Sequence, residues 1–429
     1  MLQNLLDFLS FQDINVRYVT FGSVLLAACS AVVGCFTFLK KKALVGDAVA
    51  HSVLPGVCLA FLATGTKNPV FLVVGAFLTG WISLIVIDWI TANTKLKEDT
   101  AIGLVLSVFF GIGILLLTAI QHSGNASQAG LDSFLFGKAA ALVGNDLIVF
   151  STLAVVLLAV IFLFFKEFTL ISFDLNFAKV IGYPVRKLEL LLTTLTVLAV
   201  VVGIQAVGVV LMAAMLITPA TAARFWTDKL PVMVLIAALM GAFSGFMGAL
   251  VSYLSPSMPT GPWVVLVLSI VALFSFMFAP KKGILARMML QRSNQRKICD
   301  ENILKAMYQI GETDKDFFAE RKFELIQEKR LFQTKYLKKG LNRLKREGYL
   351  QKKNNFWKFT KEGFEKGKRV TKLHRLWELY LTEYLRIAID HVHDDAETME
   401  HIITPEIEER LEQRLHYPTV DPHNTQIPK

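Results

Sequence analysis

The chain has 429 residues, of which 54% are hydrophobic and 19% are charged, and its formal net charge is +10 at pH 7. Such a composition fits neither a uniformly soluble protein nor a bare membrane bundle, and it indicates a membrane part joined to a charged soluble part. The four cysteines show no CxxC spacing and three of them lie in apolar segments, so a disulfide framework is not expected.

Apolar runs of about 20 residues recur between Tyr18 and Ala279, and this is the length needed to cross the hydrocarbon core of a bilayer. The segment before Tyr18 lacks a basic start and a small-residue cleavage site, so it is expected to lie at the membrane interface as a short amphipathic stretch. The division between the sixth and seventh spans at Gln205 stays open. Nine spans are predicted, at residues 18–39, 44–65, 69–92, 101–120, 144–165, 189–204, 207–223, 231–254 and 261–279.

Lysine and arginine are distributed unevenly between the connections of these spans. The side that receives Lys40, Lys41 and Lys42 also receives the basic residues of every second connection and the basic stretch after Ala279. The other side receives only Arg17, Lys67 and Lys138. Because basic connections stay in the cytoplasm, we expect a multi-pass protein of the bacterial inner membrane with its N-terminus outside and its C-terminal part in the cytoplasm.

The second span carries a carboxylate and an imidazole, Asp47 and His51, in an otherwise apolar run. Residues four apart stand one above the other on one helix face, so both side chains can contact one object. A charge inside the membrane is costly unless it is paired or faces a wet cavity, and a carboxylate beside an imidazole suits a first-row divalent ion. Alternatively, Asp47 caps the start of the span and His51 hydrogen-bonds a neighbouring helix. The spacing by itself favours neither interpretation.

The stretch "KKKALVGDAVAHSVLPGVCLAFLATG", residues 40–65, resembles the second-helix signature of permease subunits of ATP-binding-cassette importers for metal ions. Three further stretches match the same family: "GLDSFLFGKAAAL" at 130–142, "QAVGVVLMAAMLITPATAARFWTD" at 205–228 and "MPTGPWVVLV" at 258–267. The resemblance covers roughly residues 15 to 285. It implies that Asp47 and His51 line the translocation path of a manganese, zinc or iron ion.

Residues 172–189, "SFDLNFAKVIGYPVRKLE", predict an amphipathic loop helix that Gly182 and Pro184 end. In the resembled family this segment docks onto the ATPase subunit, so Phe177, Ala178 and Gly182 are the expected contacts. No GxxxxGK[ST] phosphate-binding stretch occurs in the chain, which is therefore not expected to be an enzyme itself. The resemblance implies an assembly with separate ATPase subunits, a second permease chain that is a copy or a relative, and an extracellular metal-binding lipoprotein.

The soluble part changes the sign of its charge along the chain. Residues 331–375 carry 15 Lys or Arg against three acids, whereas residues 376–429 carry four basic residues against twelve acidic ones. The change indicates two functional parts. We expect a membrane domain at 1–285, a second domain at 297–370 and a third region at 371–429.

The basic part, from "TKYLKKGLNRLKREGYL" onward, predicts a helix capped by Thr334 and ended by Gly348, then a hairpin with Asn354 and Asn355 at its turn. That is the layout of a winged helix-turn-helix, whose second helix enters the major groove of DNA. The candidates for DNA contact are Lys335, Lys338, Lys339 and Arg343. A solvated basic face near an anionic membrane is the alternative.

The remainder, from "HRLWELYLTEYLRIAIDHVHDDAETMEH" onward, resembles the dimerisation and metal-sensing part of diphtheria-toxin-repressor-like metalloregulators. The resemblance implies a regulatory metal, and a carboxylate rather than a thiolate at Glu397 favours manganese. Where manganese sensors carry acidic ligands this chain has Asn302 and Lys305, and a protonated Lys305 would repel a cation. The positions that match the family's ligands are His374, Glu378, His393, Glu397, Glu400 and His401. A solvated acidic helix is the alternative.

Together these patterns and resemblances predict an all-α polytopic membrane bundle followed by a winged helix-turn-helix and a helical dimerisation region. The expected function is import of divalent transition-metal ions, with manganese first and zinc or iron as alternatives, without a permanently bound cofactor. A membrane-tethered, metal-dependent transcriptional regulator is the competing hypothesis. In a third, the tail inhibits transport when cytosolic metal is high.

Overall fold

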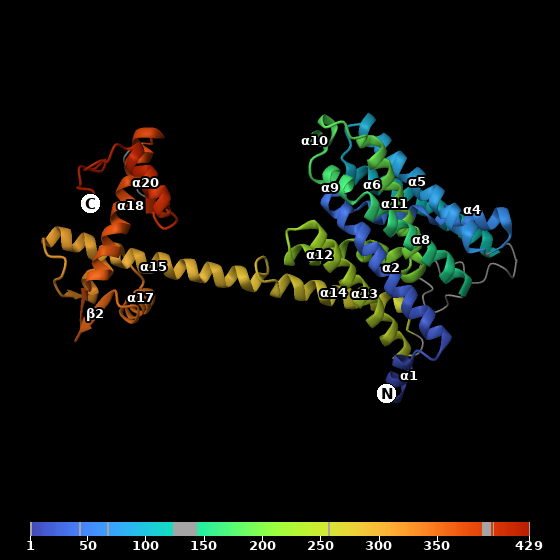
Figure 1. The fold of residues 1–429 in the computed structure, drawn as a ribbon, viewed down its shortest axis with the longest axis horizontal. Helices are drawn as coiled ribbons and strands as arrows, with labels where there is room; N and C mark the ends of the chain where they lie inside the picture. The colour runs from blue at the N-terminus through green and yellow to red at the C-terminus, as the bar shows by residue number, and fades with distance from the viewer. Residues whose placement is uncertain are drawn as a thin grey trace. The chain divides into compact units, whose positions relative to one another are not determined.

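The computed structural model describes residues 2–42, 44–66, 68–122, 144–255, 258–387, 396–397 and 399–428. The chain divides into two compact units, Met1–Ala286 and Arg287–Lys429, which we call the N-terminal and the C-terminal unit. Helices build the N-terminal unit, and a small sheet joins the helices of the C-terminal unit (Figure 1). The predicted family stretch at 130–142 lies outside the described residues.

The N-terminal unit is a bundle of apolar helices whose ends follow local capping rules. Asn68, for example, accepts a hydrogen bond from the backbone of Val70, and Pro69 opens the helix that follows. Its helices are α1 (Leu2–Ser10), α2 (Ile14–Leu39), α3 (Val45–Ser52), α4 (Leu54–Thr64), α5 (Pro69–Asn93), α6 (Glu98–His122), α8 (Gly144–Leu163), α9 (Phe165–Phe173), α10 (Leu175–Val180), α11 (Val185–Val207), α12 (Val209–Trp226), α13 (Leu230–Leu254) and α14 (Thr260–Phe278).

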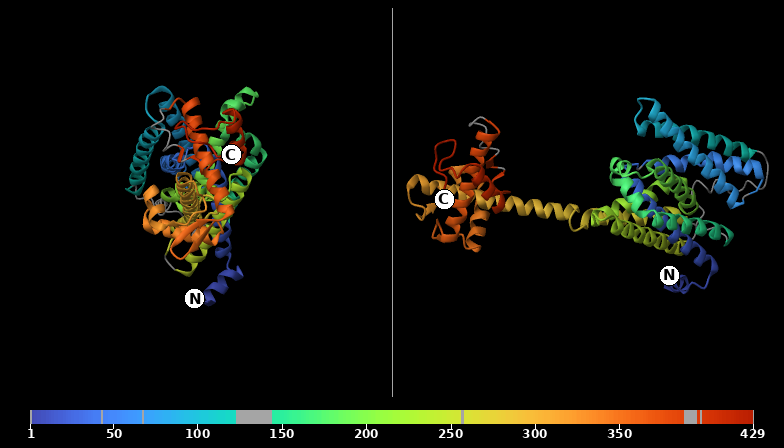
Figure 2. Two further views of the ribbon diagram at one scale, coloured as in Figure 1. Left: turned by 90° about the vertical axis from the view of Figure 1, so that its left-hand side faces the viewer. Right: turned by 45° about the horizontal axis from the view of Figure 1, so that its top comes forward.

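Helix α2 lies at the centre of this unit, where it packs against α8, α11, α12 and α13. A Cβ added to Gly34 would lie 1.7 Å from the carbonyl oxygen of Leu216, so the backbones of α2 and α12 touch there and only glycine fits. Helices α4, α5 and α6 run side by side, as both views of Figure 2 show. Of the apolar window of α2, 72% is buried, whereas in α14 the share is 22%, which leaves apolar side chains of α14 on the outer face of the unit.

Seven helices of the described residues are long and apolar enough to cross a membrane, or eight if the bent pair Leu147–Leu163 and Phe165–Phe173 forms one span. The segment Leu211–Trp226 is apolar but shorter. Each of the nine predicted spans overlaps a helix, but the number of crossings itself stays a prediction.

The C-terminal unit has a core formed by helices and a three-stranded antiparallel sheet with the strand order β1-β3-β2. The core contains Ile303, Leu337, Leu341 and Trp357. The elements are α15 (Ile284–Asp314, which begins in the N-terminal unit), β1 (Arg321–Lys322), α16 (Phe323–Arg330), α17 (Thr334–Arg346), β2 (Leu350–Lys353), β3 (Phe356–Phe359), α18 (Lys361–Tyr384) and α20 (Pro405–Arg414).

Local signals in the basic segment are confirmed with one exception. Strands β2 and β3 are joined by a two-residue turn in which Asn354 has a φ of 53°, and Gly348 has a φ of 84° after α17. The predicted cap was wrong, because α17 has Gln333 at its N-cap without a side-chain bond. Thr334 Oγ1 instead accepts a hydrogen bond from Gln327 Nε2 at 3.0 Å, which ties α17 to α16.

Candidate functional site

The first candidate site lies on the short helix α3, which carries Asp47 in its first turn and His51 in its last. The chain turns before α3 at Lys41, with a φ of 60°, and α4 restarts at once with Pro55 near its beginning. His51 Nε2 lies 3.5 Å from Asp47 Oδ1, so the two side chains meet as the i, i+4 spacing predicts.

The surroundings of this pair leave ligating atoms open. The side chain of His51 is 18% exposed and that of Asp47 is 38% exposed. Nδ1 of His51 is buried without a hydrogen-bond partner in the described part of the chain. The imidazole meets the ring of Phe110 from α6 edge-on, with centroids 4.9 Å apart. His51 Nε2 and Asp47 Oδ1, which face each other, can both bind a divalent ion.

The alternative interpretation of the pair finds no support in these contacts. Leu44 occupies the N-cap of α3, and no side chain makes a capping bond there. Among the described residues, His51 makes no hydrogen bond to a neighbouring helix, and its Nδ1 has no hydrogen-bond partner there.

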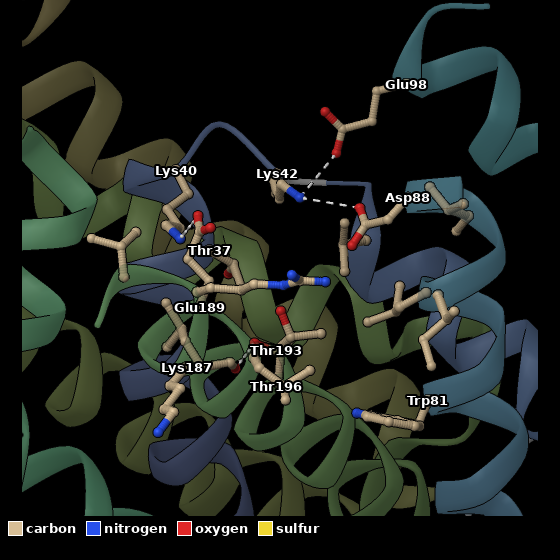
Figure 3. Close-up of a pocket in the computed structure, with 18 of the residues that line it drawn as sticks. Thr37, Lys40, Lys42, Trp81, Asp88, Glu98, Lys187, Glu189, Thr193 and Thr196 are labelled. Atoms are coloured by element: carbon tan, nitrogen blue, oxygen red, sulfur yellow. Dashed lines mark hydrogen bonds and ion pairs between the residues drawn. The ribbon is translucent and has the colours of Figure 1, made fainter. Parts of the chain in front are cut away.

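A cavity of about 830 Å³ opens beside the start of α3, between the end of α2 and helices α5, α6 and α11. Val45, two residues before Asp47, is part of its wall, together with Trp81 and Thr196. Figure 3 shows charged side chains around its rim and Thr193, Thr196 and Trp81 deeper in the view. Polar and charged side chains that line this cavity therefore lie close to the start of α3.

Ion pairs cross the rim of this cavity. Lys40 Nζ lies 2.8 Å from Glu189 Oε1, and Lys42 Nζ lies 3.7 Å from a carboxylate oxygen of both Asp88 and Glu98 (Figure 3). These contacts tie the connection between α2 and α3 to α11, α5 and α6. Sequence analysis did not identify them, because the acids lie far along the chain from the lysines.

The predicted coupling segment forms the short helix α10, capped by Asp174, which accepts a hydrogen bond of 2.8 Å from the backbone of Phe177. Phe177 is 53% exposed, and Gly182 after the helix has a φ of 93°. Ala178 is fully buried, in contrast to the expectation that it contacts a partner. Its methyl group anchors the helix, and α10 presents Phe177 outward.

The second candidate site lies in the C-terminal unit around His374 and Glu378 of α18. His374 Nε2 lies 3.1 Å from Glu378 Oε1, and its Nδ1 lies 2.5 Å from Glu400 Oε2. The same oxygen of Glu400 lies 2.7 Å from Lys305 Nζ of α15. All four side chains are at most 4% exposed. These predicted ligands do converge, but a lysine ammonium contacts the shared acid Glu400.

The neighbouring predicted ligands are also engaged by residues from other elements. Arg330, the last residue of α16, donates to Asn302 Oδ1 at 2.6 Å and to Glu397. His401 Nδ1 lies 2.6 Å from Glu301 Oε2, whereas the predicted ligand His393 lies outside the described residues. Among the described residues, no group of three or more His, Cys, Asp or Glu side chains is arranged to hold a metal ion.

Burial and pairing shift the protonation equilibria of this cluster. Burial lowers the pKa of Lys305 to about 8, although Glu400 acts in the opposite direction. Burial would raise the pKa of Glu400, but the hydrogen bond with His374 and the charge of Lys305 outweigh it and lower this pKa. Burial would likewise lower the pKa of His374, but hydrogen bonds with Glu378 and Glu400 raise it. The cluster therefore holds ionised acids and cations together.

The predicted DNA contacts on α17 divide into two kinds. Lys335, Lys338 and Lys339 are exposed, so their ammonium groups are accessible. Arg343 is not available in the same way, because its Nε and Nη2 atoms each lie 2.6 Å from a carboxylate oxygen of Asp300 in α15. This bidentate pair joins α17 to α15 and raises the pKa of Arg343.

Sequence reasoning missed Arg330 and Glu301, which bond to predicted ligands from other elements. Arg330 ends a helix and Glu301 lies next to Asn302, so neither stands out in the sequence by type or spacing. Only the fold brings them to Glu397 and His401.

Comparison with known proteins identifies two matching families. Residues 12–279 match the model described as the ABC 3 transport family. Residues 360–429 match the model described as the iron dependent repressor, metal binding and dimerisation domain.

Individual relatives agree with these matches. The manganese transport system membrane protein MntC of Bacillus subtilis (strain 168) is 46% identical over 381 residues, which cover 89% of this chain and 87% of that protein. The zinc transport system membrane protein TroC of Treponema pallidum (strain Nichols) is 44% identical over 66% of this chain and 95% of that protein. A solved structure, PsaBC from Streptococcus pneumoniae in complex with Fab, has a TM-score of 0.60 at 33% identity and covers 66% of this chain and 98% of that chain.

Proposed function

The chain belongs to the ABC 3 transport family, and from this premise we propose that it is the permease subunit of an importer for divalent transition-metal ions, with manganese as the main cargo. The observation that carries the proposal is the pair on α3. Asp47 and His51 contact each other, and Nδ1 of His51 is buried without a hydrogen-bond partner among the residues that the structure describes. Manganese, zinc and iron all accept such ligands, and the relatives named for manganese and zinc transport support this cargo class.

The chain's own residues account for the path in three steps. Asp47 and His51 bind the dehydrated ion through one oxygen and one nitrogen in place of water. The cavity beside Val45 receives the ion from α3. The ion pairs of Lys40 and Lys42 cross the rim of this cavity. The basic residues of these connections support a cytoplasmic position for this rim, with the C-terminal unit in the cytoplasm and the N-terminus outside.

The energy for transport comes in this proposal from a separate ATPase subunit that docks on α10. The exposed ring of Phe177 offers an apolar contact, Gly182 allows the turn that follows, and buried Ala178 transmits the contact to the helices beneath. The assembly also includes a second permease chain and an extracellular metal-binding lipoprotein, as the family membership supports.

Uptake of radioactive manganese into cells that lack other manganese importers tests the path. With the chain in its complete transport system, Asp47→Ala and His51→Ala are each expected to lower the initial uptake rate at least about tenfold, because each removes a direct ligand. Ser52→Ala is the matched control, since it removes from the same helix a buried hydroxyl that has no hydrogen-bond partner among the described residues. Wild-type uptake by both ligand variants at equal membrane abundance would contradict the proposal. Competition by zinc and iron in the same assay ranks the three cargoes.

A second function, DNA binding by the C-terminal unit, is favoured by one specific arrangement. The exposed Lys335, Lys338 and Lys339 lie on α17, which is followed by the basic β2–β3 hairpin, as in a winged helix-turn-helix. Gel-shift measurements on the full chain in lipid nanodiscs test it. Sequence-specific binding that weakens with salt would support this function, and binding indifferent to sequence would favour a basic face for anionic surfaces.

A further inference from the structure

The described residues of the C-terminal unit do not fit the regulatory metal that its matched family implies. We propose that the side chains of Lys305 and Arg330 take the place of metal ions in this cluster, so that the unit reaches its folded arrangement without a divalent ion and does not respond to one. The inference concerns this unit alone and holds whichever cargo the membrane path carries.

One oxygen of Glu400, Oε2, is already engaged by two groups, whereas its other oxygen, Oε1, lies 3.5 Å from His401 Nε2. A carboxylate oxygen has two lone pairs, and Glu400 Oε2 lies 2.7 Å from the ammonium of Lys305 and 2.5 Å from Nδ1 of His374. A divalent ion bound to Oε2 at about 2.0–2.2 Å, as zinc and magnesium bind oxygen, would have to displace one of them.

The imidazole is engaged on both sides. A ligating histidine must present a bare nitrogen to the metal, but Nε2 of His374 lies 3.1 Å from Glu378 and Nδ1 faces Glu400. Lys305, 1% exposed, supplies positive charge to Glu400 within the protein interior. An added divalent ion would leave uncompensated charge in a space closed to water, which is strongly unfavourable.

Arg330 takes the place of a metal ion at the neighbouring acid, Glu397, in the same way. Its planar guanidinium forks between Asn302 Oδ1, at 2.6 Å, and Glu397, and its side chain is 14% exposed. Arginine suits this role because its rigid donors bind two acceptors at once. In a metal-dependent arrangement the ion joins segments that are separate in the chain. Here the side chains of Lys305 in α15 and Arg330 in α16 make those connections, so no added ion is needed.

Hydrogen–deuterium exchange on the full chain in nanodiscs, with Mn²⁺ or with a chelator, tests the proposal peptide by peptide. We expect no change in exchange for wild-type peptides at 297–310, 366–384 and 396–410 when Mn²⁺ is added. Because the signal is read within the C-terminal unit, ion binding at α3 does not enter it. Saturable slowing of exchange in these wild-type peptides on addition of Mn²⁺ would overturn the proposal.

Two variants sharpen the test. Lys305→Met keeps the length of the side chain and removes the charge, so exchange in these peptides should become at least about tenfold faster with or without Mn²⁺. Lys305→Glu exchanges the cation for an acid, and Mn²⁺ should then slow exchange at least about tenfold. Lys361→Glu, an exposed charge reversal at the start of α18, is the control and should match wild type. Wild-type exchange in Lys305→Met would also overturn the proposal, and this outcome and the wild-type titration decide it even if Lys305→Glu fails to fold.

Discussion

Two acid–imidazole pairs with the same i, i+4 spacing lie in different chemical situations. Asp47 and His51 of α3 are 3.5 Å apart, and Nδ1 of His51 has no hydrogen-bond partner in the described ranges of the chain. His374 and Glu378 of α18 are 3.1 Å apart, but Glu400 takes the other ring nitrogen and Lys305 supplies a cation. The spacing brings acid and imidazole together, and residues from distant segments decide whether an ion can join them.

Exposure separates the two pairs further. Asp47 is 38% exposed and His51 18%, whereas His374 and Glu378 are 4% and 3% exposed. An ion that passes through must reach its ligands and leave them again, which an accessible pair allows. A sealed and internally neutralised pair stabilises one arrangement instead.

The largest expected effect comes from breaking the neutralised cluster at its shared acid. Glu400→Gln should lower the free energy of unfolding of the C-terminal unit by about 3–5 kcal/mol, because it leaves the buried Lys305 without its counter-charge. Hydrogen exchange of the full chain measures this loss. Glu409→Gln, on the exposed side of α20, should leave it within about 0.5 kcal/mol. If the double variant Lys305→Met/Glu400→Gln is no more stable than Glu400→Gln, the two charges do not stabilise each other.

The opposite change would place a cationic side chain beside the pair on α3, as Lys305 lies beside Glu400. Phe110 meets the edge of His51, so Phe110→Lys would bring an ammonium group to the pair from α6. We expect manganese uptake to fall by about 100-fold, since the lysine would compete with the ion for Asp47. Phe110→Leu keeps an apolar contact and should retain most of the uptake. Normal uptake by the lysine variant would show that the ion does not depend on this carboxylate.

A smaller effect distinguishes the paired from the unpaired cations of α17. Arg343→Ala should cost about 1.5–3 kcal/mol of unfolding free energy, because it leaves Asp300, 10% exposed, without its two charged hydrogen bonds. Lys338→Ala should change stability by less than about 0.5 kcal/mol. If the unit binds DNA, the same lysine variant should reduce the salt slope of binding by about one. Equal destabilisation by the two variants would contradict this division.

The smallest expected effect is at the rim of the cavity. Lys42 contacts Asp88 and Glu98 at 3.7 Å, and all three side chains are at least 42% exposed. Lys42→Ala should therefore change the free energy of unfolding by less than about 1 kcal/mol, and salt should reduce the difference further. Denaturation of the purified chain at low and high ionic strength measures it, and a large loss that persists in high salt would point to a role beyond a surface ion pair.

Local patterns in the sequence predicted local structure well. The spacing of Asp47 and His51, the hairpin turn at Asn354 and the helix end at Gly348 all depend on residues within a few positions of each other. The hydropathy pattern predicted where the apolar helices lie, but it did not predict the bend between α8 and α9, and the crossings at α8 and α12 stay predictions. Helix bending depends on packing between helices, which hydropathy does not report.

The sequence did not predict which side chains from distant parts of the chain contact each other. Lys305 was expected to repel a cation, but its bond to Glu400 across 95 positions has no signal in the sequence. Arg343 looked like any other basic residue of α17 until the fold brought Asp300 to it. Gly340 of α17 depends on a distant residue in the same way, because a Cβ there would lie 2.4 Å from Ile303 Cδ1, so its absence permits close packing.

The bond between Lys40 and Glu189 links the end of α2 to α11 within the N-terminal unit. Glu189 lies in the first turns of α11, which contacts α10, and Lys40 ends α2 just before the connection to α3. In the proposed mechanism, a displacement at Phe177 would pass along α11 to the backbone that leads to Asp47. Loss of the bond between Lys40 and Glu189 would then weaken this coupling while the protein remained folded and inserted.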